Sequence, residues 1–222
     1  MNDTVFSAAL FDLDGVILNT EPQYTLFWRD ECRRYFPDKP GMEYEIKGQT
    51  LVNLFDGSFR SISAGEKDAI GQRLLAFERT IKLDYIDGSM AFLHSIRANG
   101  VRTALVTSSN KGKMDIVFSR RPELESLFDA VLMSEDFDRS KPDPDCYLKA
   151  SQRLGSAPAD CIVLEDSFNG LRAGRAAGMR TVGLATTNTA ESIAPLCNIV
   201  INDFKGVDFF TMNALLRQRK EA

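Results

Sequence analysis

The sequence predicts an α/β fold, in which a doubly wound parallel sheet is interrupted by an inserted helical domain. Three observations lead to this prediction. Short apolar runs alternate with helix-like stretches along most of the chain, as is typical of βαβ units whose parallel sheet is covered on both faces. Between residues 18 and 85 helical periodicity replaces this alternation. The length of 222 residues suits one large domain or a main domain with a smaller companion.

The strand predictions rest on apolar runs that suit burial on both faces of a sheet. The first run covers residues 4–11, TVFSAALF. Three further clear runs and two weaker ones follow, at residues 103–107, 130–133, 161–164, 181–185 and 199–201. Helix-like stretches lie between them, at residues 89–98, 111–120, 143–154 and 168–177.

The inserted segment begins with a helix-start pattern. In Thr20-Glu-Pro-Gln23, Thr20 is the expected N-cap, Pro22 stands in the first turn, and Gln23 closes a capping box. We therefore expect an α/β core domain of residues 1–17 and 86–222 and a helical-bundle cap domain of residues 18–85. The two chain crossings between these domains are candidate hinges.

Charge and histidine content exclude several functions. The chain has 27 Lys+Arg against 31 Asp+Glu and a formal charge of −4, so neither nucleic acid nor an anionic membrane is an expected partner. The single histidine, His94, excludes most His-clustered metal sites. The composition leaves the oligomeric state open and is compatible with a monomer.

The cysteines and the N-terminus predict the cellular compartment. The four cysteines, at positions 32, 146, 161 and 197, lack the spacing of zinc or redox motifs. We expect them to be buried hydrophobes in a reducing compartment, with a long-range disulfide as the alternative. The N-terminus has no signal-peptide pattern, and no run reaches the ~20 apolar residues of a membrane span. A cytoplasmic protein is therefore expected.

Polar residues follow the predicted strands at the edge where open parallel sheets bind ligands. The first strand is followed by Asp12-Leu-Asp14-Gly15, the second by Thr107-Ser108-Ser109-Asn110, and a later one by Glu165-Asp166-Ser167. A fourth polar segment, Ser140-Lys141-Pro142-Asp143-Pro144, precedes a predicted helix.

The acidic residues of these segments suit a metal-assisted reaction. Asp12, Asp14, Glu165 and Asp166 would repel one another unless a cation lay between them. Oxygen ligands without His or Cys suit Mg²⁺. A carboxylate nucleophile can form an aspartyl-phosphate, and a second acid two residues later can protonate the leaving oxygen and then activate water.

The other polar residues suit a phosphate. Hydroxyl and backbone N–H groups of Thr107–Ser109, at the start of a helix, would surround phosphate oxygens, and Lys141 would supply positive charge. Each motif alone has an ordinary structural alternative, since D-x-D-G is common in turns and E-D-S caps helices. Their order and their placement after buried strands indicate one catalytic site.

At these motifs the sequence resembles the haloacid dehalogenase (HAD) superfamily of aspartyl-phosphate hydrolases. It looks most like the β-phosphoglucomutase-like phosphatases, whose helical cap follows the first strand. The four motifs that carry the resemblance are Phe11-Asp-Leu-Asp-Gly-Val16, Leu105-Val-Thr-Ser108, Lys141-Pro-Asp-Pro144 and Leu164-Glu-Asp-Ser-Phe-Asn-Gly170. The resemblance implies a Rossmann-like core sheet beneath the cap.

The resemblance also implies a role for each motif residue. Asp12 would be the nucleophile and a Mg²⁺ ligand, and Asp14 the general acid/base that also offers its backbone carbonyl to the metal. Thr107 and the adjoining Ser108 would bind the transferring phosphoryl group, which Lys141 would neutralise.

For the later acidic motif, the resemblance makes Asp166 a metal ligand. Glu165 would either ligate the metal or hold the groups around it. An acid at position 14 argues against true dehalogenases, which resemble this fold but need neither that acid nor a metal.

Two cap positions differ from the sugar-phosphate mutases of this group. In the mutases, the first cap helix carries a His that follows an aspartate by five residues. In this chain Asn19 stands at the position of that aspartate and Tyr24 at the position of the His. They also carry a cap-loop Arg, where this chain has Leu51. A hydrolase that releases inorganic phosphate therefore fits better than a mutase.

We expect the cap to select the substrate. The loop residues Lys47, Gly48 and Gln49 are the predicted substrate-binding residues of the cap. Arg73 and Arg79 are spaced to share a helix face, for which a solvated face is expected and a phosphate clamp is the alternative.

The sequence thus predicts a Mg²⁺-dependent phosphatase that acts on a small phosphorylated metabolite, in the first place a sugar phosphate. A sugar-phosphate isomerase of the β-phosphoglucomutase type is the alternative. A third hypothesis is a non-enzymatic domain that binds a partner or a phosphorylated ligand. It requires damage to at least one motif, and all four are intact.

Overall fold

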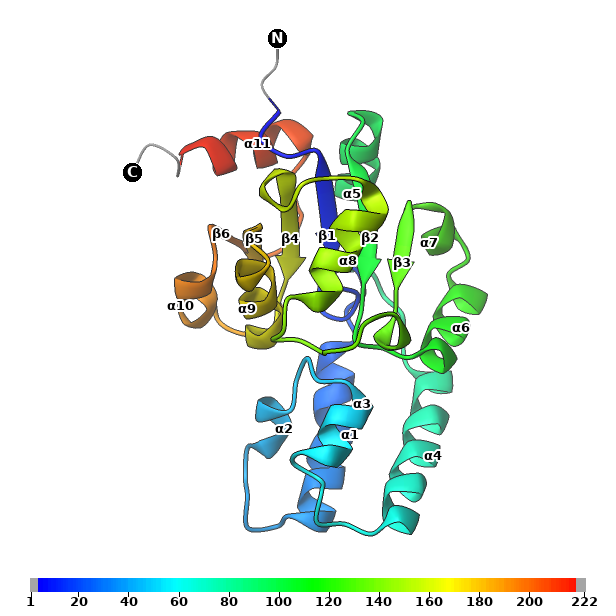
Figure 1. Cartoon of the computed structure of the whole chain (residues 1–222). Helices are drawn as coiled ribbons and strands as arrows, with labels where there is room; N and C mark the ends of the chain where they lie inside the picture. Colours follow the sequence, from blue (N-terminus) through cyan, green and yellow to red (C-terminus); the bar gives the residue numbers. More distant parts are fainter. Residues whose placement is uncertain (1–3, 219–222) are drawn as a thin grey trace.

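A sheet of six parallel strands forms the centre of the computed structural model, which describes residues 4–218 (Figure 1). Its strands, in the order β3-β2-β1-β4-β5-β6, are β1 Ala8–Phe11, β2 Arg102–Val106, β3 Ala130–Leu132, β4 Cys161–Glu165, β5 Arg180–Leu184 and β6 Ile199–Ile201. The chain runs outward from β1 to β3 and then returns to the other side of β1, so the topological switch point lies between β1 and β4. The predicted α/β fold and all six strands are confirmed.

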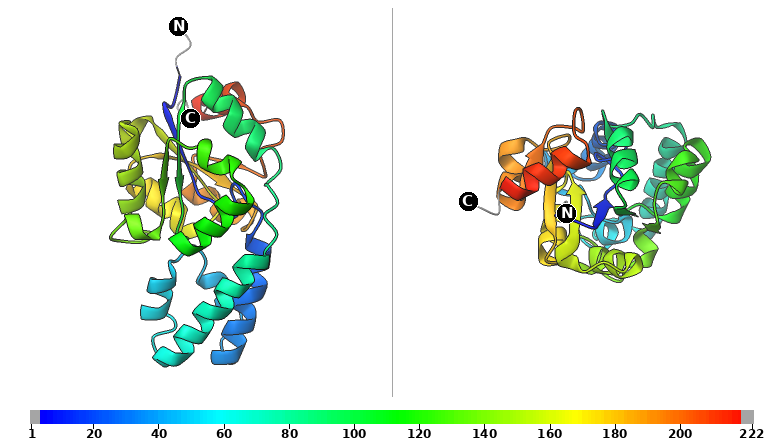
Figure 2. Two further views of the ribbon diagram at one scale, coloured as in Figure 1. Left: turned by 90° about the vertical axis from the view of Figure 1, so that its right-hand side faces the viewer. Right: turned by 90° about the horizontal axis from the view of Figure 1, so that it is seen from above.

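Helices cover both faces of the sheet, as the two views in Figure 2 show. Alternate residues of β1 point to opposite faces. Ala9 and Phe11 belong to an apolar cluster with residues of α5 (Ser89–Ala98), α6 (Lys111–Arg120) and α11 (Phe209–Gln218). Ala8 and Leu10 belong to a second cluster with residues of α8 (Asp145–Leu154) and α9 (Phe168–Ala176). Two short helices complete this part, α7 (Glu123–Ser126) and α10 (Ala190–Ile193).

Four helices of the inserted segment lie beyond the carboxyl ends of the strands (Figure 1). They are α1 Glu21–Tyr35, α2 Met42–Glu45, α3 Leu51–Asp56 and α4 Ala64–Thr80. The insert has an apolar cluster of its own, which is formed by Cys32, Met42, Ile46, Leu54, Phe59 and Ile70. Tyr24 and Leu74 of the insert belong instead to the apolar cluster that contains Ala9 and Phe11 of the sheet. We call this helical layer the cap, and the exact domain boundaries stay a prediction.

The two chain crossings between sheet and cap are hydrogen-bonded to each other. The amide of Asn19 donates to the carbonyl of Asp84 at 2.8 Å, and the amide of Ile86 donates to the carbonyl of Ile17 at 2.9 Å. Leu18 and Tyr85 form an antiparallel bridge between these two bonds. The two candidate hinges are therefore joined side by side.

The predicted capping box at the start of α1 is wrong. Thr20 precedes the helix, but its side chain caps no helical amide. Its hydroxyl donates instead to the Asp14 carboxylate. The Gln23 side chain pairs with the backbone of Lys82, accepting from its amide at 2.9 Å and donating to its carbonyl at 3.0 Å. Partners from other parts of the chain therefore replace the local capping contacts.

The structure also bears on the predictions about a disulfide and about a membrane-spanning helix. All four cysteines are free thiols, and Cys32, Cys146 and Cys161 are buried, so the disulfide alternative is wrong. Within residues 4–218 no helix combines the length and the apolar character that a membrane crossing requires.

Candidate active site

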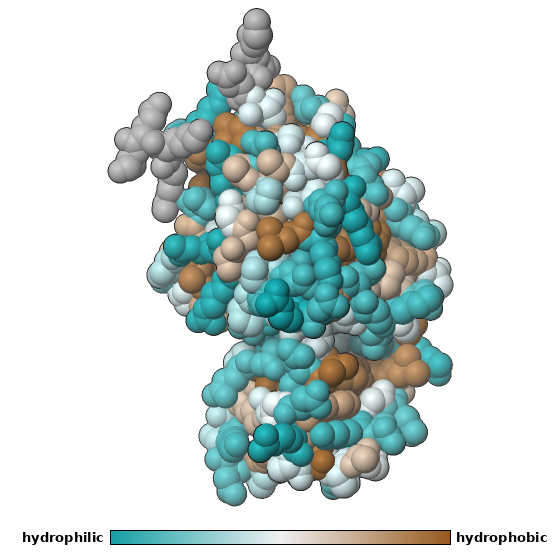
Figure 3. Space-filling view, viewed as in Figure 1, coloured by the Kyte–Doolittle hydropathy of each residue, from teal (hydrophilic) through white to brown (hydrophobic). Residues whose placement is uncertain are grey.

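A cavity of about 680 Å³ lies between the carboxyl ends of the central strands and the cap. In the space-filling view a waist separates the two lobes of the molecule at this level (Figure 3). The volume falls in the range of small-molecule sites. Every residue predicted for the site lines this cavity: Asp12, Asp14, Lys47, Gly48, Gln49, Thr107, Ser108, Ser109, Lys141, Glu165 and Asp166.

Lys141 is the buried cation of the site, with 2% of its surface exposed. Its Nζ donates to Asp12 Oδ1 at 2.7 Å, to Glu165 Oε1 at 2.6 Å and to the carbonyl of Val106 at 3.2 Å. Burial alone would lower its pKa, but the Asp12 and Glu165 carboxylates raise the pKa of Lys141 well above its usual value. Lys141 is therefore a fixed positive charge beside Asp12.

Glu165 is held on both carboxylate oxygens. Its Oε1 accepts from Lys141 and from the Tyr147 hydroxyl at 2.9 Å. Its Oε2 accepts from the amides of Asp166 and Ser167, each at 3.1 Å, and from the Ser167 hydroxyl at 3.0 Å. A Cβ atom on Gly170 would lie 1.7 Å from Glu165 Oε1, so the carboxylate needs glycine there. These contacts favour the alternative that Glu165 holds its neighbours in place.

Asp12, Glu165 and Asp166 form an acidic cluster at the switch point between β1 and β4. Each can offer a carboxylate oxygen, and these oxygens lie within 4.8 Å of one another. Burial raises the pKa of Asp12 to about 7, with smaller raising effects from Glu165 and Asp14 and a lowering effect from Lys141. Burial and the neighbouring carboxylates raise the pKa of Asp166 well above its usual value.

One oxygen of this cluster has no hydrogen-bond partner. Asp166 Oδ2 is buried and forms no hydrogen bond of ordinary geometry with a described residue, although the nearby Thr187 hydroxyl lowers the pKa of Asp166 against the larger effect of burial. Gly15 lies against it with a φ of +76°, and a Cβ atom there would stand 2.0 Å from this oxygen. An unpartnered buried carboxylate oxygen in an all-oxygen cluster fits a hard divalent cation such as Mg²⁺. Asp12 and Asp166 are the side chains with oxygens available to hold it.

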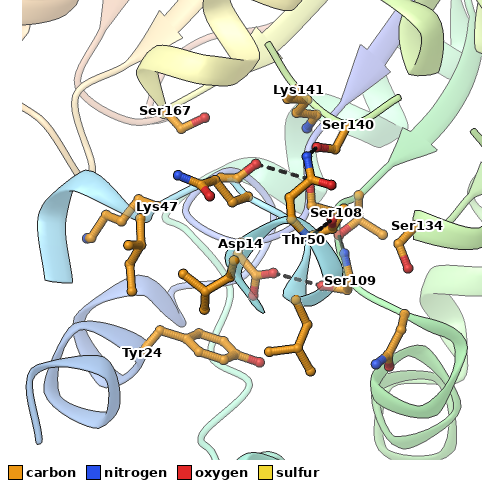
Figure 4. A pocket seen from close by; sticks show the side chains of 18 of the residues that line it. Asp14, Tyr24, Lys47, Thr50, Ser108, Ser109, Ser134, Ser140, Lys141 and Ser167 are labelled. Carbon is orange, nitrogen blue, oxygen red and sulfur yellow. Dashed lines mark hydrogen bonds between the residues drawn. The ribbon is translucent and has the colours of Figure 1, made fainter. Parts of the chain in front are cut away.

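Asp14 accepts hydrogen bonds from three donors at the edge of the cavity, and Figure 4 shows the one from Ser109. Its carboxylate accepts from the hydroxyl of Thr20, from the hydroxyl of Ser109 at 3.2 Å and from the Nζ of Lys113. Lys113 also lies over the ring of Tyr24, with 4.4 Å between its Nζ and the ring centroid. Asp14 therefore connects the loop after β1, helix α6 and the first cap helix.

The loop after β2 uses most of its polar groups within the protein. The Thr107 amide donates to the Leu132 carbonyl at 3.0 Å, and the Ser109 amide donates to Thr107 Oγ1 at 3.1 Å. Of the three amides predicted to surround a phosphate, only that of Ser108 has no partner among residues 4–218. Of the three backbone amides predicted to bind phosphate, one is therefore available, because strand pairing engages the Thr107 amide and a turn engages the Ser109 amide.

The cap loop rests on the sheet domain at several points. The Ser108 hydroxyl donates to the Gly48 carbonyl at 3.3 Å, and Asn169 Nδ2 donates to the Lys47 carbonyl at 3.2 Å. Asn53 Nδ2 bonds to the Ser140 hydroxyl. A Cβ atom on Gly48 would meet Ser167 Oγ at 2.9 Å, so glycine lets the loop approach closely. The cap is therefore closed over the cavity.

Several residues of the site were not predicted from the sequence. Tyr147 and Lys113 contact the predicted carboxylates, and the Tyr24 hydroxyl donates to Glu78 Oε1 at 2.9 Å. Lys113 stands one turn into the helix that follows the T-S-S motif, and this position was its only signal in the sequence. Glu78 is buried in the cap, and the sequence pattern offers no means of distinguishing it from an exposed helix glutamate.

The phosphate-clamp alternative for the cap arginines is wrong. Arg73 forms two hydrogen bonds of 2.7 Å with the Glu31 carboxylate. Neither Arg73 nor Arg79 lines the cavity. Arg73 therefore ties α4 to α1 and does not face a ligand.

The fold and the site define a class of enzyme: a hydrolase with a Rossmann-like α/β fold, whose acidic site lies at the switch point of a parallel sheet and faces an inserted helical cap. The chain belongs to the haloacid dehalogenase-like hydrolase family, which it matches over residues 6–178. This membership confirms the resemblance. Together with the phosphatases among its relatives, it makes the chain a phosphoric monoester hydrolase.

Known proteins similar to the chain agree with this assignment. Validoxylamine A 7'-phosphate phosphatase from Streptomyces hygroscopicus subsp. limoneus is 28% identical over 91% of this chain and 96% of its own length. Hexitol phosphatase A from Escherichia coli is 30% identical over 79% of this chain and 81% of its own length. The structure of β-phosphoglucomutase from Clostridium difficile is similar in fold, with a TM-score of 0.78 at 20% identity, covering 98% of this chain and all of the other.

Proposed function

We propose that the chain is a Mg²⁺-dependent phosphatase that hydrolyses a small phosphorylated metabolite, in the first place a sugar phosphate, through an aspartyl-phosphate on Asp12. One observation carries the proposal: the buried Asp12 carboxylate lies between a fixed cation, Lys141, and Asp166, whose Oδ2 has no partner among the described residues. Relatives named for hexitol and validoxylamine phosphates support the substrate class.

Asp12 and Asp166 would hold the metal through their carboxylates, and the family resemblance adds the backbone carbonyl of Asp14. Bound there, Mg²⁺ would neutralise charge on the phosphate and on the carboxylates around it. Glu165, whose oxygens are all engaged, anchors Lys141 in this arrangement.

Phosphoryl transfer to the protein is the first step. One carboxylate oxygen of Asp12 attacks phosphorus, while Lys141 holds the carboxylate in place through its hydrogen bond to Oδ1. The bond from phosphorus to the ester oxygen breaks, and Asp14 donates a proton to that leaving oxygen. Thr107 and Ser108 bind the phosphoryl oxygens, and Lys141 stabilises their charge.

Hydrolysis of the aspartyl-phosphate is the second step. Asp14, now ionised, takes a proton from water, and the water oxygen attacks phosphorus. The bond between phosphorus and Asp12 breaks, which releases inorganic phosphate and restores the Asp12 carboxylate and the protonated Asp14. Closure of the cap loop, including Lys47, excludes bulk water, and its reopening releases the products.

The mutase alternative has less support from the site. Tyr24 stands at the position of the mutase histidine, and its hydroxyl is engaged by Glu78. Leu51 lines the cavity at the position of the mutase arginine. With β-glucose 1-phosphate as substrate, we expect phosphate release without glucose 6-phosphate.

The Asp12→Asn variant tests the mechanism. Because an amide cannot act as this nucleophile, hydrolysis of p-nitrophenyl phosphate with Mg²⁺ should fall by about 10⁴-fold or more. The matched control is Asp30→Asn, on the exposed side of α1, which should keep wild-type activity. Undiminished hydrolysis by Asp12→Asn, with a folded protein shown by its thermal transition, would remove the aspartyl-phosphate mechanism.

A further inference from the structure

Glu43 is a largely buried residue of the cap whose carboxylate has no partner among the described residues. It lies on α2, lines the cavity and has 8% of its surface exposed. Within residues 4–218 no hydrogen bond or ion pair engages its side chain. The other buried glutamates are all bonded: Glu31 to Arg73, Glu78 to Tyr24, and Glu165 to Lys141.

The Glu43 oxygens are not among the buried unpartnered atoms of residues 4–218, so they are open to the cavity, and a ligand that displaces the cavity water must replace its hydrogen bonds. Removing a carboxylate from water is costly unless hydrogen-bond donors or a cation replace the water. Its titratable neighbour Cys32 supplies no charge, because burial and then the Glu43 and Glu31 carboxylates raise the pKa of that thiol to about 11. A ligand in the cavity is therefore the available source of donors for Glu43.

The cations of the cavity are already engaged. Three lysines line it, and each is paired with a carboxylate: Lys47 with Glu21 at 2.9 Å, Lys113 with Asp14, and Lys141 with Asp12 and Glu165. No arginine occurs among the described lining residues, whereas nine carboxylates do. A second anionic group on the substrate would find no free cation and would meet the field of these carboxylates.

We infer that Glu43 is a specificity-determining residue, which selects monophosphates whose leaving group carries hydroxyl or protonated amino groups and no second anion. The inference rests on the proposed function, since it concerns the part of the substrate that departs from the phosphate. Both donor types satisfy a carboxylate, and a like charge beside it is rejected.

The wild-type enzyme can be tested with substrates that differ in one group. Glucitol 6-phosphate and 6-phosphogluconate differ by a carboxylate at the carbon farthest from the phosphate. We expect kcat/KM to be higher for glucitol 6-phosphate by about 30-fold or more, because like charges oppose binding. Equal kcat/KM values for the two would overturn the inference. Glucosamine 6-phosphate against glucose 6-phosphate then shows whether the donor is an amine or a hydroxyl.

The Glu43→Gln variant assigns the selection to this residue. Removing its charge should reduce the ratio of kcat/KM between glucitol 6-phosphate and 6-phosphogluconate by about tenfold. Glu45→Gln, on the exposed side of the same short helix, should leave the ratio unchanged. A merely structural Glu43 would lower both values together, so an unchanged ratio in Glu43→Gln contradicts the inference.

The outcomes separate this inference from the proposed function. If the wild-type enzyme does not hydrolyse p-nitrophenyl phosphate with Mg²⁺, the proposed function fails. If it does so but accepts 6-phosphogluconate as well as glucitol 6-phosphate, only the role of Glu43 fails. Should Glu43→Gln not fold, the comparison of the two wild-type substrates still decides.

Discussion

The sheet side and the cap side of the cavity differ in how their buried charges are held. On the sheet side, Lys141 has three hydrogen-bond acceptors and both oxygens of Glu165 are occupied. On the cap side, Glu43 has no partner among the described residues and Lys47 has one ion pair. Where each group is held by several others, a single change disturbs the whole arrangement.

The difference in glycines points the same way. Gly15 and Gly170 each lie so close to a site carboxylate that any side chain would overlap it. In the cap, Gly48 is constrained in the same way by Ser167 Oγ, but Gly65 and Gly71 of α4 have open space where a Cβ atom would stand. The sheet side of the site is thus fixed in one geometry, whereas the cap away from its loop tolerates substitution. We therefore expect chemistry to depend on the first and selection on the second.

After Asp12→Asn, the Asp14→Asn variant should have the largest effect on turnover. Loss of the acid/base should reduce steady-state hydrolysis of an alkyl phosphate by about 10²- to 10⁴-fold. With p-nitrophenyl phosphate, whose leaving group needs no proton, a burst of nitrophenol equal to the enzyme concentration should precede slow turnover. Stopped-flow absorbance measures the burst, and its absence would argue against the two roles of Asp14.

Lys141→Met should lower hydrolysis of every substrate alike, by about 10³-fold. It also leaves Asp12 and Glu165 buried without their cation, so the free energy of unfolding should fall by about 3–5 kcal/mol. Lys149→Met is the matched control, because Lys149 is paired with Asp138 and Asp145 at the surface. Urea unfolding and aryl phosphate hydrolysis measure both effects, and a substrate-dependent loss would contradict the division between sheet and cap.

Stability should depend on pH through the buried acid of the sheet side. Burial raises the pKa of Asp12 from 3.8 to about 7, against a partial lowering by Lys141. Between these two values the native protein retains a proton that the unfolded chain has lost. The free energy of unfolding of the metal-free protein should therefore fall as pH rises from 5.5 to 7.5, by up to about 1.4 kcal/mol per pH unit.

Two comparisons test whether Asp12 causes this change of the free energy of unfolding with pH, which we call the slope. Mg²⁺ should flatten it, because a cation favours the ionised carboxylates. Asp12→Asn, which cannot titrate, should also flatten it, while Asp30→Asn should keep the wild-type slope. Urea unfolding at three pH values gives the measurement, and a slope that survives in Asp12→Asn would assign it to another group.

The smallest effect is expected where the cap loop touches the sheet domain. Asn169→Ala removes the hydrogen bond to the Lys47 carbonyl. If the closed position of the cap is destabilised by about 1 kcal/mol, kcat/KM should fall by about fivefold. Asn99→Ala, at a surface helix end, should change nothing. A loss as large as that of Asp14→Asn would show that this contact shapes the chemical site.

The strands could be predicted because each is a short apolar run, and their ends then placed the motifs. The run at residues 161–164 proved to be β4, one residue longer than predicted. Since all strands are parallel, Asp12 and Asp166 had to meet at one edge of the sheet. Their placement followed from local patterns and a topological rule.

The contacts across the cavity could not be predicted in this way. The Thr20 hydroxyl bonds to Asp14 through a turn, and Gln23 pairs with Lys82 on the returning crossing. Glu43 and Glu78 have the sequence surroundings of ordinary helix glutamates, and only the packing of the cap buries them. Such groups are identified by their neighbours in space, for which a single sequence carries no signal.

The paired crossings have a consequence for how the protein can change. Leu18 and Tyr85 are bridged, so the 66 residues between them leave and re-enter the sheet domain at one point. A segment whose two ends are neighbours can be shortened, extended or exchanged without moving the elements to which it is attached. The cap can therefore be exchanged as one segment. Recombination, in nature or at the bench, can graft a foreign specificity here, provided that the new segment keeps the contact that Thr20 makes with Asp14.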